Sequence, residues 1–291
     1  MGKLFALLSA FIWAVAVILF KKSGEKVPPF SLNLFRVVIS AILLVITLAV
    51  MDEPLWGRAP LRDYIILFLS GIIAIAISDT LFHRSLNIVG AGISAIVDCL
   101  YSPMVVILAF LFIGERFSFL QIFGMVFVLS GIIVAGSHEP PEGVDPRRLT
   151  IGILIGVLAM ITLAVGIVIA KPVLDRSPVL WATTVRQIGC LVVMIPSALL
   201  SPRRWEILRT FKPSRAWKFS LPGSILGSYL ALIFWITGMK YTLAGTAAIL
   251  NQSSTIFILI FATLFLHERF TTKKLLASAL SFSGIIMVTL G

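Results

Sequence analysis

The sequence predicts an all-α integral membrane protein whose ten transmembrane helices form two inverted five-helix repeats. Three observations predict this fold class: an apolar composition, a series of long apolar runs, and an internal repeat. Of the 291 residues, 59% are hydrophobic and 13% are charged, whereas soluble globular domains are about 45–50% apolar and about 25% charged. The composition therefore excludes a soluble enzyme and a disordered chain.

The apolar residues are gathered in ten runs. A helix needs about 20 residues to cross the ~30 Å hydrocarbon core of a bilayer. The runs are continuously apolar rather than alternating, which argues against a β-barrel. The predicted spans are Leu4–Phe20, Ser31–Val50, Tyr64–His83, Ala91–Phe112, Ser118–Gly136, Ile151–Ala170, Val179–Leu200, Phe219–Met239, Ala244–Leu266 and Leu275–Leu290.

The fourth and fifth predicted spans align with the ninth and tenth at a constant offset of 153 residues, without a gap. The alignment pairs Glu115-Arg116-Phe117 with Glu268-Arg269-Phe270, in the connection between the two spans. An apolar composition inflates chance matches, but it does not place the same Glu-Arg-Phe run at the same point. At an offset of 150, Lys21 falls on Lys171. The chain is therefore predicted to be a duplicated five-helix unit.

The two copies are predicted to occupy residues 1–136 and 147–291. Because five is an odd number of spans, the two copies enter the membrane from opposite sides. They are then inverted and related by a pseudo-two-fold axis in the plane of the membrane. Alternating-access carriers are built in this way, with the ligand at the interface of the repeats.

The lysines and arginines outside the spans are distributed unequally. The side of the termini holds seven and the opposite side fifteen, six of them between residues 201 and 218. Cytoplasmic loops carry the excess of positive charge, so this count predicts termini outside the cell, in an inner or plasma membrane. Basic residues spaced between apolar runs are typical of membrane-flanking loops and not of a nucleic-acid interface.

Four charged residues lie well inside the predicted spans: Arg36, Asp79, Asp98 and Arg186. A charge at this depth costs several kcal/mol and therefore needs a partner, water or a function. At ~1.5 Å of rise per residue, the first three lie at about the same depth. We expect Arg36 to pair with Asp98 or Asp79, the alternative being that its side chain snorkels to the interface. Asp79 and His83, four residues apart, are expected to form an interfacial pair, with a proton path as the alternative.

The internal alignment pairs Asp98 with Asn251 and the following residue, Cys99, with Gln252. Tyr101 shares a helix face with Asp98. Equivalent polar faces on two inverted helices meet near the pseudo-axis, so the candidates for binding a substrate are Asp98, Tyr101, Asn251 and Gln252. The alternative is that they only bond neighbouring helices to each other. Asp98 is also the candidate for coupling to protons.

Arg186 has no acid at its own level, because Leu232 and Asn251 stand where the first half has its two aspartates. Such a cation is suited to bind the carboxylate of an amino-acid-like substrate, with snorkelling as the alternative. Trp13 lies near the middle of its span and is a candidate aromatic wall of a cavity, although aromatic residues of membrane proteins are often interfacial anchors.

Two five-helix units, each with a Glu-Arg turn before a glycine-bearing last helix, resemble the EamA family of the drug/metabolite transporter superfamily. The resemblance covers essentially the whole chain and is carried by Trp13, Arg36, Pro103 and the turns Gly114-Glu115-Arg116 and His267-Glu268-Arg269. It implies a ten-helix bundle with a central cavity. It also implies transport, often export, of amino acids, other small metabolites and drugs.

Together these features predict a secondary transporter that exports small organic metabolites, such as amino acids or drug-like solutes, by alternating access. The alternative is a lipid or polyprenyl-linked-sugar flippase of the same superfamily. An enzyme is not predicted, because no His-Glu-x-x-His or other catalytic motif is present, and the spans carry too few polar residues for a channel. The expected partners are the substrate and the bilayer, with no cofactor, metal or nucleic acid. A monomer is expected, with a dimer as the alternative.

Overall fold

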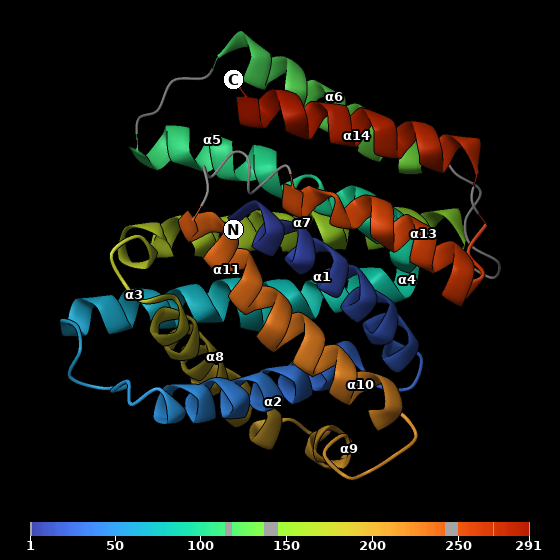
Figure 1. Ribbon diagram of the computed structural model, residues 1–291. Helices are drawn as coiled ribbons and strands as arrows, with labels where there is room; N and C mark the ends of the chain where they lie inside the picture. Colours follow the sequence, from blue (N-terminus) through green and yellow to red (C-terminus); the bar gives the residue numbers. More distant parts are fainter. Residues whose placement is uncertain (1, 114–117, 137–144, 242–249, 270, 291) are drawn as a thin grey trace.

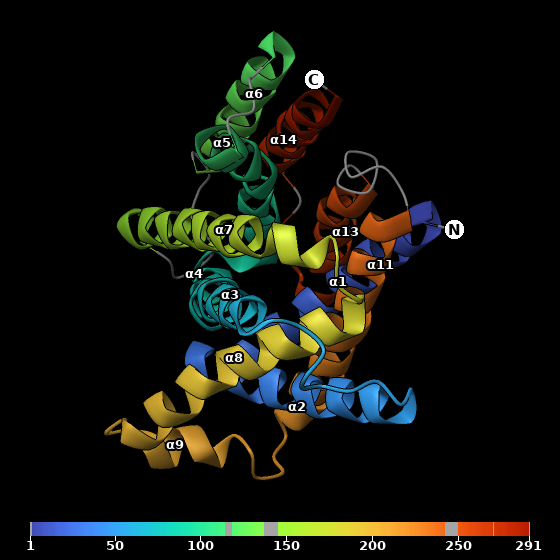
Figure 2. The same ribbon diagram turned by 90° about the vertical axis from the view of Figure 1, so that its left-hand side faces the viewer.

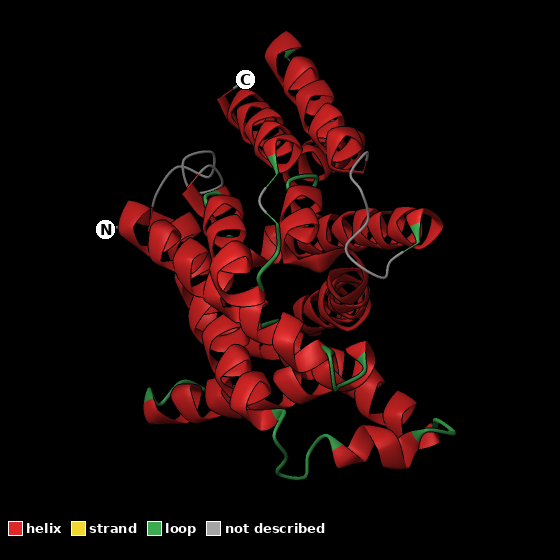
Figure 3. Ribbon diagram, turned by 90° about the vertical axis from the view of Figure 1, so that its right-hand side faces the viewer, coloured by secondary structure: helices red, strands yellow, loops and turns green. Residues whose placement is uncertain are grey.

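The computed structural model describes residues 2–113, 118–136, 145–241, 250–269 and 271–290. Within these ranges the regular elements are all helical (Figure 3). Six helical stretches in them are long and apolar enough to cross a membrane, and two shorter apolar helices cover Phe119–Val134 and Leu250–Leu266. The six are Gly2–Gly24, Pro29–Val50, Leu61–Asp98, Pro146–Leu174, Val179–Leu200 and Trp217–Gly238.

The predicted all-helical class is confirmed, whereas ten crossings in two inverted repeats remain a prediction. The helices follow one another in the order of Figure 1. They are α1 (Gly2–Gly24), α2 (Pro29–Val50), α3 (Leu61–Gly71), η1 (Ile72–Ile77), α4 (Ser78–Asp98), α5 (Tyr101–Ile113), α6 (Phe119–Gly136), α7 (Pro146–Leu174), α8 (Val179–Leu200), α9 (Arg204–Arg209), α10 (Trp217–Gly223), η2 (Ser224–Ala231), α11 (Leu232–Tyr241), α13 (Ser254–Leu266) and α14 (Thr272–Leu290).

Helices α2 and α8 begin at the same kind of signal. Pro28 is the N-cap of α2 and is followed by Pro29 in the first turn, and Pro178 is the N-cap of α8. Proline suits the first turn of a helix, because its fixed φ is helical and its missing N–H would have no partner there. The first and last residues of α2 and α8 differ by 150, and the last residues of α1 and α7 differ by the same number.

The third and eighth predicted spans each contain a π-helical segment, η1 and η2. An offset of 153 residues places η1 entirely inside η2. Such segments are rare and are frequent at functional sites. In η1 the wider turn leaves carbonyl groups for other donors: the Asn33 amide nitrogen lies 2.8 Å from the Ile75 oxygen and 3.3 Å from the Ala76 oxygen.

The fourth predicted span is not one continuous helix. Helix α4 ends at Asp98, and α5 begins at Tyr101. Pro103 explains the interruption, because it lacks the N–H that would bond the Cys99 carbonyl in a continuous helix. The backbone tightens instead, and Leu100 N–H donates to the carbonyl of Val97, three residues earlier.

The ninth predicted span is interrupted at the equivalent place, although it has Ile256 where the fourth has Pro103. Ser253, which aligns with Leu100, is a turn residue between residues 250–252 and α13. Its hydroxyl donates to the Leu250 carbonyl at 2.5 Å. A serine side chain competes in this way with the backbone bonds of a helix.

Helices α6 and α14 lie side by side at one edge of the molecule, far from α2 and α9 (Figures 1 and 2). Small residues allow their close approach. A Cβ atom on Gly131 would collide with the Ser281 hydroxyl, and one on Gly284 would lie 2.5 Å from the Gly124 carbonyl oxygen. Phe119 and Ile133, on α6, are exposed, as expected for residues that face lipid.

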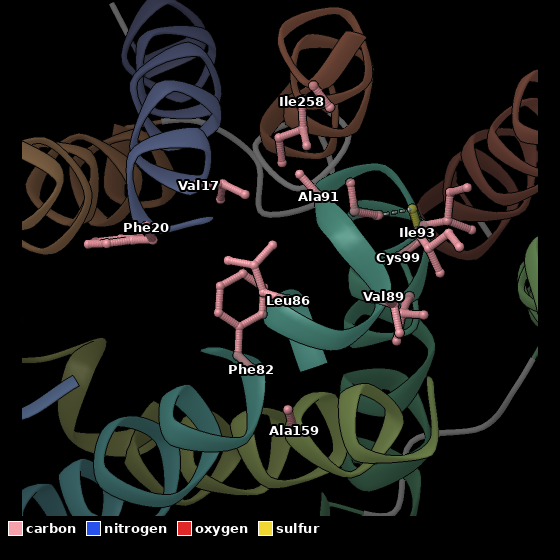
Figure 4. Close-up of a cluster of buried hydrophobic side chains, with 14 of the residues drawn as sticks. Val17, Phe20, Phe82, Leu86, Val89, Ala91, Ile93, Cys99, Ala159 and Ile258 are labelled. Atoms are coloured by element: carbon pink, nitrogen blue, oxygen red, sulfur yellow. Dashed lines mark hydrogen bonds between the residues drawn. The ribbon is translucent and has the colours of Figure 1, made fainter. Parts of the chain in front are cut away.

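A buried apolar layer joins α1, α4, α7 and α13 (Figure 4). We call the end of the bundle at which α1 finishes the Gly24 end, and the end at which α1 starts the Gly2 end. The layer lies towards the Gly24 end, because it includes Val17 and Phe20 of α1 and Leu86 of α4, all less than 2% exposed.

Candidate functional site

A cavity of about 190 Å³ lies inside the bundle, large enough for several waters or a small organic molecule. Its walls come from α1, α2, η1, α4, α5, α7, α8, η2, α11 and residues 251–254. The structure brings all six predicted substrate-binding residues together in this lining: Trp13, Asp98, Tyr101, Arg186, Asn251 and Gln252. Arg36 and Asp79 also line the cavity.

The two interruptions supply several of the polar groups of the cavity. Asp98 is the last residue of α4, and Asn251 and Gln252 precede the turn at Ser253. Interrupted helices in membrane transporters place backbone and side-chain polar groups at the substrate site. The two interruptions are also bonded to each other, because the Thr255 hydroxyl lies 3.3 Å from the Ala95 carbonyl oxygen.

Arg36 forms an ion pair with Asp79, one of the two partners predicted from the depth of these residues in the membrane. The side chain turns into the bundle and does not snorkel, since Arg36 is only 5% exposed. Its guanidinium also lies over the ring of Phe20, 5.7 Å from the ring centroid, an arrangement in which the ring quadrupole attracts the cation. The positive charge of Arg36 is therefore balanced within the protein.

Arg186 has a different environment. Its Nε donates to the Ser70 hydroxyl at 3.0 Å, and the residue is 3% exposed. Among the described residues no carboxylate is bonded to it. Ser70 is a neutral partner, so the charge of Arg186 is left without a bonded counterion in the cavity wall.

Asp98 also makes no hydrogen bond or ion pair with the described part of the chain. The cavity thus holds one paired guanidinium–carboxylate couple, Arg36 with Asp79, and two unpaired groups of opposite charge, Asp98 and Arg186. Amide groups of Gln187, Asn251 and Gln252 also belong to the polar part of the lining. Chemically, this arrangement is suited to a small molecule that carries both a negative and a positive group.

The interfacial pair expected between Asp79 and His83 is wrong. The His83 ring nitrogen Nδ1 bonds the backbone oxygen of Asp79 at 2.5 Å, because the Asp79 carboxylate is already paired with Arg36. His83 is fully buried, with its ring 5.0 Å from that of Phe20 and 5.5 Å from that of Phe82. It belongs to the apolar layer and is not part of the cavity lining.

Sequence reasoning missed several residues of the cavity. Gln187 is 1% exposed and directly follows Arg186, so an amide within an apolar run was the signal that would have found it. Ser228 lies in η2 and Ser254 at the start of α13. Small hydroxyl residues are common in membrane helices, and their sequence pattern does not distinguish a cavity wall from a helix contact.

Comparison with known proteins places the chain in a family. The model of the EamA-like transporter family matches residues 1–137 and again residues 150–290. An uncharacterised transporter of Archaeoglobus fulgidus is 24% identical over 288 residues, which is 99% of this chain and 97% of that protein. An uncharacterised transporter of Clostridium kluyveri is 25% identical over 133 residues, 46% of this chain and 43% of the other.

A protein of known crystal structure has the same fold. It superposes with a TM-score of 0.69 at 20% identity, covering 99% of this chain and 96% of the other. At this identity the likeness concerns the fold alone. The family matches, which between them span nearly the whole sequence, and the long apolar helices make this chain a multi-pass membrane protein. The chain belongs to the EamA-like transporter family of membrane transporters.

Proposed function

We propose that the chain is a secondary transporter that exports small organic metabolites, amino acids above all, through the cavity by alternating access. The observation that carries this proposal is that two oppositely charged groups, Arg186 and Asp98, line one cavity without an ion-pair partner among the described residues. A substrate carboxylate would bond the guanidinium of Arg186, and a substrate ammonium group would bond the carboxylate of Asp98. Both are charge-assisted hydrogen bonds, which are roughly twice as strong as neutral ones.

Alternating access requires two related halves that exchange roles around a central site. The positions of the helix irregularities support such a pair of halves. The π-helical segments η1 and η2, and the interruptions near Leu100 and Ser253, recur at an offset of 153 residues. Since a π-helix is rare, its recurrence at equivalent positions favours the inverted duplication of residues 1–136 and 147–291.

Proton coupling is part of the proposal and is assigned to Asp98. This carboxyl group lines the cavity without a bonded cation, so a proton and a substrate ammonium group compete for the same oxygens. A transporter that releases one when it binds the other couples the two movements. Asp79 is less suited to this role, because its carboxylate is paired with Arg36.

A melting-temperature screen with matched ligands tests the proposal. A ligand that binds only the folded protein stabilises it, by about 2.7 kcal/mol when the ligand concentration is 100 times its Kd, and thereby raises its melting temperature. We expect an amino acid to stabilise the purified protein, and its deaminated acid and its decarboxylated amine to have little effect. Equal shifts with all three would contradict recognition by Arg186 and Asp98, and stabilisation only by a polyprenyl-linked sugar would favour the flippase.

Export is tested in cells with the amino acid that the screen identifies. Cells that express the chain and are loaded with the labelled amino acid should release it faster than cells with an empty vector. Faster accumulation from outside, without faster release, would instead indicate an importer.

A further inference from the structure

The Gly24 end of the bundle is tied together by a cluster of polar contacts. The Lys21 ammonium group donates to the carbonyl oxygens of Leu86, at 3.0 Å, and Asn87, at 2.9 Å. The Asn87 amide in turn donates to the Gly24 carbonyl at 3.1 Å. The last turn of α1 is thereby fixed to α4.

These contacts lie next to an interruption of α4 at Gly90, whose φ of 82° breaks the helix. Beyond the interruption, the N–H groups of Ala91 and Gly92 donate to the two carboxylate oxygens of Glu268, at 2.6 and 3.1 Å. The Lys274 ammonium group lies 3.2 Å from the same carboxylate. Glu268 belongs to the Glu-Arg-Phe run that the sequence repeats.

The break at Gly90 creates two helix ends within α4. Lys21 bonds the free carbonyl groups of the first end, and Glu268 bonds the free N–H groups of the second. The end before the break presents free carbonyl groups, which attract a cation, and the end after it presents free N–H groups, which attract an anion. One interruption in α4 is thus held from both sides, by α1 and by the connection between α13 and α14.

The cluster lies beyond the apolar layer, as seen from the cavity. Along α1, Ser9 and Trp13 line the cavity, Val17 and Phe20 belong to the layer, and Lys21 follows. From Trp13 to Lys21 the helix rises about 12 Å. Packed side chains therefore lie between the cavity and Lys21, and the labelled residues of Figure 4 show part of this packing.

Within the described part of the chain, the corresponding lysine at the Gly2 end makes no such contacts. Lys171 aligns with Lys21 at an offset of 150, and the carbonyls that correspond to its acceptors, at an offset of 153, are those of Met239 and Lys240 in α11. Among the described residues, Lys171 bonds only Asp175, four residues further along the chain, and the two side chains are 44% and 60% exposed. Glu115, the counterpart of Glu268, lies outside the described residues.

We propose that Lys21 and Glu268 form a latch that holds the Gly24 end closed, and that Lys171 is the counterpart of Lys21 that engages α11 when the Gly2 end closes. This inference rests on the proposed alternating access. In one conformation Lys21 is bonded across helices and Lys171 is free of them. In the opposite conformation the two lysines exchange these roles.

Sided cysteine labelling tests the latch. Ser228, whose small side chain lines the cavity, is replaced as Ser228→Cys, and a membrane-impermeant maleimide is applied from each side of the membrane, in intact cells and in inverted vesicles. Cys99 and Cys190 are buried, and the parent chain without Ser228→Cys measures their background. Added Lys21→Met should raise labelling from the Gly24 side at least about fivefold relative to the Gly2 side.

Lys171→Met is the matched control, because it removes the same charge at the equivalent position. We expect it to leave labelling from the Gly24 side unchanged or lower. An unchanged ratio in Lys21→Met, or an equal rise in Lys171→Met, would overturn the latch. If Ser228→Cys is labelled from one side only in every variant, including Lys21→Met and Lys171→Met, the result contradicts alternating access as well as the latch.

A disulfide lock provides a second measurement that does not depend on the stability of Lys21→Met. A Cβ atom on Gly24 would lie 2.8 Å from the Cγ atom of Asn87, so Gly24→Cys with Asn87→Cys places two thiols within reach. Oxidation with copper phenanthroline should abolish labelling of Ser228→Cys from the Gly24 side, and a reductant should restore it. Labelling that persists in the oxidised protein would show that this end opens elsewhere.

Discussion

Arg36 and Asp79 are bonded to each other across α2 and α4, at the edge of the cavity. The duplicated position keeps the cation, as Arg186, but replaces the acid by Leu232. One half of the chain therefore neutralises its arginine internally, while the other leaves a guanidinium in the cavity wall. This difference divides the two arginines into a structural residue and a candidate binding residue.

Arg36→Leu should destabilise the protein by about 3–5 kcal/mol, because it leaves the Asp79 carboxylate buried without a partner. The double variant Arg36→Leu with Asp79→Leu removes both charges, and much of the lost stability should return. Melting temperatures in detergent, followed by size-exclusion chromatography, measure both. A double variant no more stable than Arg36→Leu alone would show that the ion pair is not the source of the loss.

Arg186→Leu should weaken amino-acid binding by about 10- to 150-fold, the loss of one charged hydrogen-bond interaction of about 1.5–3 kcal/mol. Arg186→Lys should retain part of the affinity, since it keeps the charge and loses the planar two-nitrogen geometry. Titration of the melting temperature with the ligand measures these affinities. Arg203→Leu, an exposed arginine outside the cavity, is the control. Unchanged affinity in Arg186→Leu would remove this residue from the site.

Hydropathy predicted where the helices lie, and α8 has the predicted bounds, Val179–Leu200. It did not predict η1 and η2. An apolar run can form an α-helix or a π-helix, and hydropathy does not distinguish the hydrogen-bond patterns of the two. The interruption after Asp98 had a visible cause in Pro103, but the equivalent one at Ser253 had no proline. Interruptions of this kind are decided by local hydrogen bonding and tertiary packing.

The sequence predicted which residues line the cavity better than it predicted their contacts. The internal alignment matched Asp98 with Asn251, and both line the cavity. Rise along a helix gives the depth of a residue but not the direction of its side chain, so Arg36 had two acids within reach in the sequence. His83 was expected at the interface for the same reason, whereas the packing of Phe20 of α1 buries it.

Asp98→Asn should abolish the dependence of transport on an imposed pH gradient, because the amide neither binds nor releases a proton at physiological pH. Exchange of labelled for unlabelled amino acid across proteoliposomes, which needs no gradient, should persist at a reduced rate. Flux is measured with and without the gradient for the parent, Asp98→Asn and the exposed control Asp52→Asn. If Asp98→Asn still responds to the gradient as the parent does, the coupling group is another residue.

Gly90→Ala tests how closely the break in α4 is fitted to Glu268. Gly90 has a φ of 82°, and a Cβ atom there would lie 2.7 Å from a carboxylate oxygen of Glu268. Gly57 has a similar φ of 77° but no atom within 4 Å of such a Cβ, so Gly57→Ala measures the backbone strain alone. With a ψ of 171°, Gly90 lies in a backbone region that is essentially confined to glycine, where a side chain costs about 1–3 kcal/mol.

We expect Gly90→Ala to lower the melting temperature clearly more than Gly57→Ala, because the added methyl group also displaces Glu268 from the N–H groups of Ala91 and Gly92. Adding Glu268→Gln should then cost less stability in the Gly90→Ala background than in the parent, since the contact is already weakened there. Equal losses in the two alanine variants would mean that the carboxylate moves aside freely and that the break in α4 does not depend on it.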